Sequence, residues 1–462
     1  MSGNSERLGA SFRDPGGFIF RRDGVLYRQI NQACQKAYDK LMSSGVYDIL
    51  TLKRMLIPHA EVDEPAAEPA LAYKVIRPER VAFISYPYEW SFSQLKDAAL
   101  LTLASTRAAL EKGMILKDAS AYNIQFVDGK PLLIDTLSFD LYHEGAPWDA
   151  YRQFCQHFLA PLALAAMVDI RLMQLLRVYI DGVPLDLASE LLPAKTKLGL
   201  SGLALHIHIH AKVQKQYSDK QASQAAAVKL SKAALLNMID GLEKTILPLK
   251  WEPRGTEWGG YYDSTNYSED ALNTKGELVA KFAEIAQPRS AWDLGANNGL
   301  FSRVLSQRGV ETVASDIDPA AVEQNYLALK NNPEPALLPL VIDLTNPSPA
   351  LGWAHRERDS MLGRGPVDLV MALALLHHLA ISNNVPLETV ARFMAEAGEW
   401  AIVEFVPKSD SQVKRLLATR KDIFDQYTEQ GFEEAFLQFF TLEQKAEIAG
   451  SQRTLYLFRR RQ

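Results

Sequence analysis

Two hydrophobic patterns divide the chain, and the change falls near residue 275. Beyond that point, short apolar runs alternate with stretches in which apolar residues recur every three to four positions. Short apolar runs are typical of buried strands, and the three-to-four spacing is typical of amphipathic helices. Because strands that alternate with helices favour a parallel, doubly wound sheet, we predict an α/β domain over residues 255–462.

Six strands and four helices of this domain can be placed from the pattern. The predicted strands are 290–295, 312–318, 337–344, 367–376, 400–406 and 453–461. The predicted helices are 275–286, 299–309, 320–332 and 386–398. Several of the strands end in polar residues. In an open α/β sheet, ligands bind beyond the carboxyl ends of the strands, so these residues are the first candidates for a site.

The first half of the chain has a mixed α+β pattern. Residues 18–30, "FIFRRDGVLYRQI", indicate a hairpin that turns at an Asp-Gly pair. Residues 91–113 indicate a long helix that starts at a serine and stops at a glycine. We predict a disordered N-terminus over residues 1–17 and one domain over residues 18–245. The stretch 250–270, rich in Gly, Trp and Tyr and without a clear period, marks the boundary.

Composition narrows the class of protein. The 462 residues carry a net charge of -5, so no basic balance points to a nucleic-acid partner. Two cysteines, Cys34 and Cys155, are too few for a disulfide scaffold and suit a reducing compartment. The polar start of the chain is not a signal peptide, and the apolar run 158–168 is too short to span a membrane. We expect a cytoplasmic protein, and no pattern fixes its oligomeric state.

A glycine turn follows the first predicted strand of the C-terminal domain, in "AWDLGANNGLF", residues 291–301. A dinucleotide fingerprint that starts at Gly295 needs glycine at two further positions, which are Asn297 and Leu300. A phosphate-binding P-loop is excluded, because no Gly-Lys-Ser/Thr follows. Asp293, just before the turn, would repel an anion. The turn therefore favours a cationic ligand over a phosphate.

The residues D-x-G-x-N-x-G at 293–299 resemble the first motif of class I S-adenosylmethionine-dependent methyltransferases, with Asn297 in place of the middle glycine. The phrases "ALALLHHLAISNNVPLETV" and "EFVPKSDSQVKRLL" look like a bacterial group of these enzymes that is related to nodulation proteins. The resemblance implies a seven-stranded, Rossmann-like sheet and S-adenosylmethionine as cofactor. The cofactor-binding residues that it implies are Asp293, Gly295, Asn297, Gly299, Asp316 and Asp343.

Roles for the strand-end acids follow from this resemblance. Asp316 ends the second strand, where a carboxylate can accept hydrogen bonds from both ribose hydroxyls, and Asp343 would accept one from the adenine amino group. Two other interpretations stay open. The acids are also suited to cap helices or loops, and the domain would also suit a nicotinamide cofactor.

Candidates for catalysis lie at the ends of the fourth and fifth strands. His377 and His378 are the best general bases for an acceptor that must lose a proton, and only one of them would face the ligand. Glu404 would orient the acceptor, or else be a solvated loop acid. The acceptor itself, a small molecule, a glycan or a protein, cannot be read from the sequence. An aromatic lid over the sulfonium is a further candidate, formed by Tyr261, Tyr262 and Tyr267.

Residues 116–140, "LKDASAYNIQFVDGKPLLIDTLSFD", resemble the catalytic core of protein kinases and aminoglycoside phosphotransferases. The resemblance implies Asp118 as base and Asn123 and Asp135 as metal ligands. Leu116 stands where that core has a histidine, so we expect a kinase-like scaffold for acceptor recognition. A bifunctional enzyme with phosphotransferase activity is one alternative, and a non-catalytic regulator that binds the cofactor is another.

The repeat "HIHIH", residues 206–210, would place three histidines on one face of a strand. The flanking sequence favours a helix, which separates His208 from His206 and His210. We therefore predict no metal site.

Overall fold

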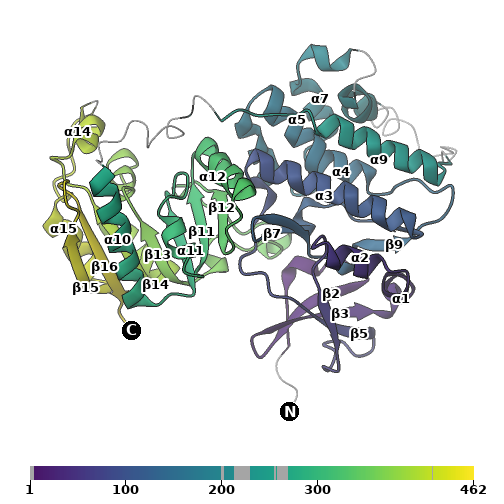
Figure 1. The fold of residues 1–462 in the computed structure, drawn as a ribbon, viewed down its shortest axis with the longest axis horizontal. Helices are drawn as coiled ribbons and strands as arrows, with labels where there is room; N and C mark the ends of the chain where they lie inside the picture. The colour runs from purple at the N-terminus through teal and green to yellow at the C-terminus, as the bar shows by residue number, and fades with distance from the viewer. Residues whose placement is uncertain (1–4, 199–201, 213–228, 254–255, 257–268, 419) are drawn as a thin grey trace. The chain divides into compact units, whose positions relative to one another are not determined.

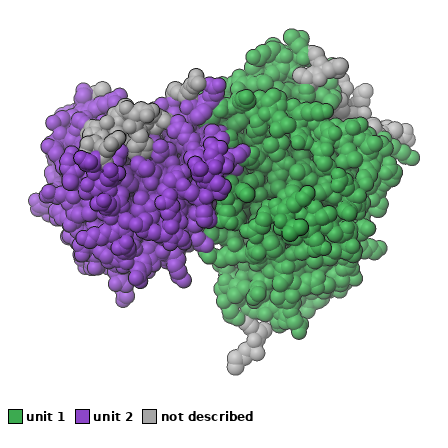
Figure 2. Space-filling model, in the orientation of Figure 1, with its two compact units in different colours: residues 1–251, 351–358 green, residues 252–350, 359–462 purple. Residues whose placement is uncertain are grey.

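The computed structural model of the chain describes residues 5–198, 202–212, 229–253, 256, 269–418 and 420–462. It forms two compact units (Figure 2), each with its own sheet and helices (Figure 1). Unit 1 comprises residues 1–251 and 351–358, and unit 2 comprises residues 252–350 and 359–462.

Unit 1 contains an antiparallel five-stranded sheet in the order β1-β2-β3-β5-β4. The predicted hairpin turns at Asp23–Gly24, where both residues have positive φ. β1 lies in the segment predicted to be disordered. It differs from that prediction because its two residues pair with Phe20 and Arg21 of β2. The strand bounds are β1 Glu6–Arg7, β2 Gly17–Arg22, β3 Val25–Asn31, β4 His59–Val62 and β5 Ala72–Pro78.

The helix α3, Phe92–Glu111, packs against α9, Lys232–Ile246, in unit 1. It begins with a capping box, in which Ser91 and Gln94 each accept a hydrogen bond from the other's backbone N–H group. Two small antiparallel pairs follow, β6 with β9 and β7 with β8. The bounds of the other main elements of unit 1 are α1 Gln35–Ser43, α2 Val46–Leu52, β6 Met114–Leu116, β7 Ile124–Val127, β8 Lys130–Leu133, β9 Phe139–Leu141, α4 Tyr151–Phe154, α5 Ala160–Met167, α6 Leu175–Val178 and α7 Leu185–Leu191.

Unit 1 also includes residues 351–358, which come from much later in the chain. Glu357 is 5% exposed, and one of its carboxylate oxygens accepts two hydrogen bonds from the Arg13 guanidinium, at 3.1 and 2.7 Å. The guanidinium of Arg358 lies over the Tyr122 ring, 4.3 Å from its centre. Residues from two separate stretches of sequence therefore fold together in this unit.

Unit 2 contains a seven-stranded sheet in the order β12-β11-β10-β13-β14-β16-β15. The five strands from β12 to β14 are parallel. The chain runs outward from β10 to β12 and then returns to β13 on the other side of β10, so the strand order reverses between β10 and β13. The strand bounds are β10 Ser290–Leu294, β11 Glu311–Asp316, β12 Leu337–Val341, β13 Val367–Ala372, β14 Gly398–Phe405, β15 Phe440–Glu447 and β16 Thr454–Arg460.

The prediction of a parallel sheet is wrong for the two strands that lie beyond β14. β16 is antiparallel to β14, and β15 is antiparallel to β16, so the sheet is mixed. β15 is also absent from the predicted strands. Its sequence is FTLEQKAE, and most of its side chains are exposed, so it has no apolar run that a pattern could detect.

Helices cover both faces of the sheet of unit 2. On one face, Val279 and Phe282 of α10 form a core with Leu369 of β13 and Ile402 of β14. On the other face, Phe436 of α15 stacks on a phenylalanine of β16. The helix bounds are α10 Glu269–Ala286, α11 Ser302–Ser306, α12 Pro319–Asn331, α13 Leu387–Ala397, α14 Ser411–Leu417 and α15 Glu429–Leu437. Among the helices described, none is both long and apolar enough to cross a lipid bilayer.

Candidate functional site

A cavity of about 350 Å³ lies at the carboxyl ends of β10, β11, β12 and β13. Ligands bind at this place in open α/β sheets, because the strand order reverses there. The volume falls within the range of small-molecule pockets, roughly 300–1,000 Å³. Five of the six residues predicted to bind the cofactor line the cavity, as does one of the three predicted catalytic residues. They are Asp293, Gly295, Asn297, Asp316, Asp343 and His378.

The turn after β10 has left-handed backbone conformations at three positions, with φ of 72° at Gly295, 51° at Asn297 and 80° at Gly299. A Cβ atom at Gly299 would lie 2.4 Å from Nδ2 of Asn325, so only glycine fits there. Asparagine is one of the few other residues that adopt the left-handed region at low cost. Asn297 can therefore stand in place of the middle glycine of the motif and keep a left-handed backbone conformation.

Asp293 lies near the end of β10 and is 2% exposed. Its Oδ2 accepts a hydrogen bond of 2.6 Å from the Ser302 hydroxyl. Burial raises the pKa of the Asp293 carboxyl to about 7, although Ser302 and the nearby Lys275 oppose this effect. Its charge near neutral pH therefore depends on the ligand, and a bound cation would favour the ionised form.

Asp316 and Asp343 extend the acidic wall along the next two strands. Asp316 ends β11 and accepts hydrogen bonds from the backbone N–H groups of Asn297, at 2.7 Å, and Asp318, at 2.9 Å. Burial raises the pKa of its carboxyl to about 6. Asp343 follows β12, and its Oδ1 accepts bonds from the backbone and the hydroxyl of Thr345. Three carboxyl groups thus line one cavity at consecutive strand ends, which favours a positively charged ligand.

The two histidines after β13 have different environments. His378 lines the cavity, whereas His377 is 2% exposed and is not among the lining residues. Their ring centres are 4.2 Å apart. Burial and the charge of Arg453 lower the pKa of His378 to about 4, and burial lowers the pKa of His377 well below its usual value. Both rings are neutral at pH 7, and His378 is the one that a ligand would meet.

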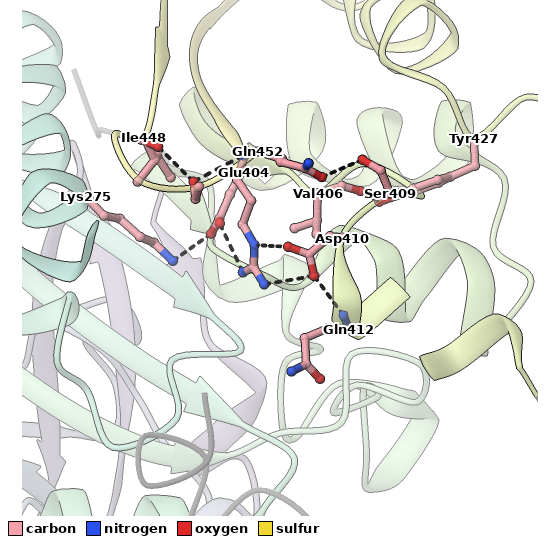
Figure 3. Close-up of polar contacts among 11 residues, drawn as sticks. Lys275, Glu404, Val406, Ser409, Asp410, Gln412, Tyr427, Ile448 and Gln452 are labelled. Carbon is pink, nitrogen blue, oxygen red and sulfur yellow. Dashed lines mark hydrogen bonds and ion pairs between the residues drawn. The ribbon is translucent and has the colours of Figure 1, made fainter. Parts of the chain in front are cut away.

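Glu404, predicted to orient the acceptor or else to be a solvated loop acid, is not among the residues that line the cavity, and its burial contradicts the second of these roles. It is fully buried near the end of β14. Its carboxylate accepts a hydrogen bond of 2.6 Å from Lys275 and one of 3.4 Å from Arg453 (Figure 3). Arg453 also donates to both oxygens of Asp410, at 2.8 and 3.3 Å. We call these four buried residues, Lys275, Glu404, Arg453 and Asp410, the ion quartet.

Lys275 is a lining residue that the sequence did not indicate. It belongs to α10, is 2% exposed, and places its Nζ 4.5 Å from the centre of the Phe301 ring. Lysine is among the residue types that are least often buried, and at helical spacing it is normally assigned to the solvent face. A buried lysine therefore leaves no signal in a sequence pattern of this kind.

In unit 1, the residues that resemble a kinase core are tied to other side chains. Asn123 donates to the Ser138 hydroxyl, which donates to Oδ2 of Asp135 at 2.9 Å. Oδ1 of Asp135 forms a 2.7 Å ion pair with Arg28. Asp118 accepts bonds from Ser120 and Gln153. Within the described residues, no group of three or more His, Cys, Asp or Glu side chains is arranged to hold a metal ion. A guanidinium therefore occupies one side of the predicted metal ligand Asp135.

The histidines of "HIHIH" lie in a π-helical turn, Ala204–Ile209, and in the residue that follows it. His206 bonds to the Tyr151 hydroxyl at 2.7 Å, whereas His208 bonds to the hydroxyls of Ser189 and Thr196. The different partners show that His206 and His208 do not face a common point. The predicted aromatic lid falls outside the described residues: Tyr261, Tyr262 and Tyr267.

Comparisons with known proteins give one extensive match. No protein-family model matches the sequence. The chain is 36% identical to the nodulation protein NoeA of Rhizobium meliloti (strain 1021), over 98% of this chain and 96% of that protein. The bifunctional kinase–methyltransferase WbdD is 18% identical, with a TM-score of 0.30, over 46% of this chain and 44% of that chain. The magnesium protoporphyrin IX methyltransferase of Synechocystis PCC 6803 is 16% identical, with a TM-score of 0.31, over 44% and 93%. Both TM-scores are low, so the similarity to these two structures does not indicate what this chain binds.

Proposed function

The chain belongs to the family of the nodulation protein NoeA, and we propose that its unit 2 is an S-adenosylmethionine-dependent methyltransferase. The family's name specifies no chemistry, so the proposal rests on the cavity. Its main support is that Asp293, Asp316 and Asp343 line one cavity from three consecutive strand ends. S-adenosylmethionine carries a sulfonium and an ammonium group, and carboxylates are the side chains that stabilise such cations.

The residues present fit the nucleoside of this cofactor. Asp316 keeps lone pairs for the ribose hydroxyls, because each carboxylate oxygen accepts more than one hydrogen bond. Asp343, on the next strand, would accept a bond from the adenine amino group. The glycine turn lets the backbone approach the ligand at Gly295, which lines the cavity and has no side chain. Ile317 and Ile342 add apolar surface for the adenine ring.

The bound sulfonium supplies an activated methyl group, so the protein mainly has to align the acceptor and exclude water. Such alignment is worth about 7–11 kcal/mol of barrier. Leu375, Leu379 and Leu416 form apolar walls on the side of the cavity where His378 lies. The pKa of His378 is lowered to about 4, so His378 is a weak base. We therefore assign it another role, in which its ring accepts a hydrogen bond from the molecule that receives the methyl group. The ring of His377 packs against that of His378, with the ring centres 4.2 Å apart.

For unit 1 we propose a kinase-like scaffold that recognises the acceptor, a small molecule, a glycan or a protein. The ion pair between Arg28 and Asp135 argues against phosphoryl transfer, since Asp135 would have to leave Arg28 before it could bind magnesium. The bifunctional alternative therefore requires a rearrangement at this pair. It predicts magnesium-ATP binding that is lost on Asp135→Ala.

The test is calorimetry with S-adenosylmethionine, S-adenosylhomocysteine, ATP and NAD, each titrated separately into the full chain. We expect the two sulfur-containing ligands to bind and Asp316→Asn to weaken both by about 10- to 100-fold, the effect of losing hydrogen bonds to a charged group. Glu388→Gln, an exposed acid on α13, is the control and should bind as the wild type does. Tight binding of NAD alone would reverse the assignment. Formation of S-adenosylhomocysteine on addition of cell extract would separate an enzyme from a cofactor-binding regulator.

A further inference from the structure

Among the lining residues of the cavity, Lys275 is the only lysine or arginine, and this holds for the residues that the structure describes. Its side chain is 2% exposed, so its ammonium group is directed into the protein and not to solvent. Burial lowers the pKa of Lys275, and the adjacent Glu404 and Asp293 oppose this effect. A cation in a cavity that three acids also line needs an explanation, because it does not favour a positively charged ligand.

The strand order indicates which part of the cofactor would meet Lys275. Asp343 follows β12 and Asp316 ends β11, so under the proposed function the nucleoside lies toward that side of the sheet. The rest of an extended ligand must then lie toward β10, β13 and β14. Lys275 is on this side, since its Nζ bonds to Glu404 of β14. The part of S-adenosylmethionine that remains is its amino-acid end, which carries one ammonium and one carboxylate group.

The charges near this end match such a zwitterion. Asp293 lines the cavity beside Lys275, close enough for each to change the pKa of the other. We propose that Lys275 binds the carboxylate of the cofactor's amino-acid end, while Asp293 faces its ammonium group. This inference rests on the proposed function and deepens it, because it names the residue that selects a cofactor with an intact amino acid.

The ion quartet explains how a flexible lysine keeps this position. Oε2 of Glu404 accepts a 2.6 Å bond from Lys275 (Figure 3), and its Oε1 accepts one of 3.4 Å from Arg453. Asp410 anchors Arg453 and also caps α14, since its Oδ1 accepts a 2.8 Å bond from the backbone N–H of Gln412. Leu416 of the same helix lines the cavity. Glu404, Arg453 and Asp410 are therefore positioning residues, and they act on the ligand through Lys275.

The test compares two ligands that differ in one group. S-adenosylhomocysteine has the carboxylate, and its decarboxylated analogue, S-adenosyl-3-thiopropylamine, keeps the nucleoside, the sulfur and the amine. We expect the wild type to bind S-adenosylhomocysteine about 10- to 100-fold more tightly, the range for a charge-assisted hydrogen bond. In Lys275→Met this preference should fall to about one, because only the first ligand loses affinity. Lys275→Arg should keep most of it.

A preference that survives in Lys275→Met would overturn the assignment, as would equal binding of both ligands by the wild type. Failure of both ligands to bind the wild type would instead refute the proposed function. If Lys275→Met does not fold, the double variant Lys275→Met/Glu404→Gln removes the buried charge left behind and allows the same comparison. Asp410→Asn tests positioning: it should lower the preference while the analogue binds unchanged, and an equal loss for both ligands would refute that role.

Discussion

Lys275 and Glu404 are 129 residues apart in sequence, yet their charged groups lie 2.6 Å apart with the side chains 2% and 0% exposed. Taking two charges out of water costs free energy that a single ion pair barely offsets. Here Arg453 and Asp410 extend the pair to four alternating charges, so each carboxylate contacts a cation. The carboxyl edge of β14 is thus fixed electrostatically as well as by packing.

Removal of the Glu404 carboxylate should therefore destabilise the protein. Glu404→Ala leaves two buried cations without this carboxylate, and we expect the free energy of unfolding to fall by about 3–5 kcal/mol. Chemical denaturation of the full chain, followed by a probe in unit 2, measures it. The control is Asp422→Ala, which breaks the more exposed 2.8 Å pair with Lys408 and should have a much smaller effect on stability, because solvent screens this pair. Similar losses in the two variants would contradict a structural role for the ion quartet.

The glycine turn makes a second prediction. Gly299→Ala introduces both a positive-φ strain and a clash with Asn325, and should destabilise unit 2 by about 1–3 kcal/mol and weaken cofactor binding. Gly276→Ala, in α10, meets no atom within 4 Å and should stabilise the helix by about 0.5–1 kcal/mol. Asn297→Gly should retain binding. Thermal unfolding with and without S-adenosylhomocysteine checks all three, and a tolerated Gly299→Ala would show that the described turn is incorrect.

Proton linkage gives a third prediction. Since the pKa of Asp293 is raised to about 7 and that of Asp316 to about 6, both acids become protonated as the pH falls from 8 to 5.5. Affinity for the sulfonium of S-adenosylmethionine should fall with them, by at most about tenfold per pH unit for each group. S-adenosylhomocysteine lacks the sulfonium but keeps the ammonium group that Asp293 would face, so its affinity should also fall, by a smaller factor. Calorimetry across this range tests the point, and Asp293→Asn should flatten the upper part of the curve. A pH-independent affinity for both ligands would contradict it.

The carboxyl of Asp293 also makes the free energy of unfolding depend on pH, and the direction of this dependence can be predicted. Its pKa in the unfolded chain is near 3.8, so between about pH 4 and 7 the native state binds more protons than the unfolded state. Asp293 therefore lowers the free energy of unfolding as the pH rises through this window. Relative to the wild type, Asp293→Asn should become progressively more stable from pH 5 to about pH 7. If the Asp293 carboxyl were ionised throughout, denaturation at several pH values would show no such trend.

The Arg28–Asp135 pair allows a prediction for unit 1. Arg28 is 7% and Asp135 15% exposed, so Arg28→Gln leaves a largely buried carboxylate unpaired and should cost about 1–3 kcal/mol in unit 1. Arg7→Gln, which breaks the exposed pair with Glu68, should cost less than about 1 kcal/mol. Neither change should alter S-adenosylhomocysteine binding. Magnesium-ATP binding gained in Arg28→Gln would show that the arginine alone blocks a metal site.

The acids of the site could be predicted from sequence because each one terminates an apolar strand, and parallel strands end along one edge. Asp316 and Asp343 needed no knowledge of tertiary contacts for that reason. Glu404 occupies a similar place in the pattern, but its burial depends on Lys275 and Arg453, which are distant in sequence. A local pattern shows that a strand ends in an acid and does not show whether a cation covers it.

The elements that escaped prediction share a physical cause. β15 is recognised by its backbone pairing with β16, not by apolar side chains, since most of its residues are exposed. Residues 351–358 fold with unit 1 through Glu357 and Arg358, although their neighbours in sequence belong to unit 2. In both cases the structure is determined by contacts between residues that are distant in sequence. The periodicity of apolar residues reflects only which nearby side chains are buried.

This last arrangement affects any attempt to study the halves in isolation. A fragment that stops at residue 251 would leave Arg13 without Glu357 and Tyr122 without the guanidinium above it. A fragment that begins at residue 252 would carry the eight displaced residues with nothing of their own unit to fold against. Poor folding of either fragment would result from the loss of these contacts between residues 351–358 and the rest of unit 1. The function of each unit should therefore be studied with point variants of the intact polypeptide.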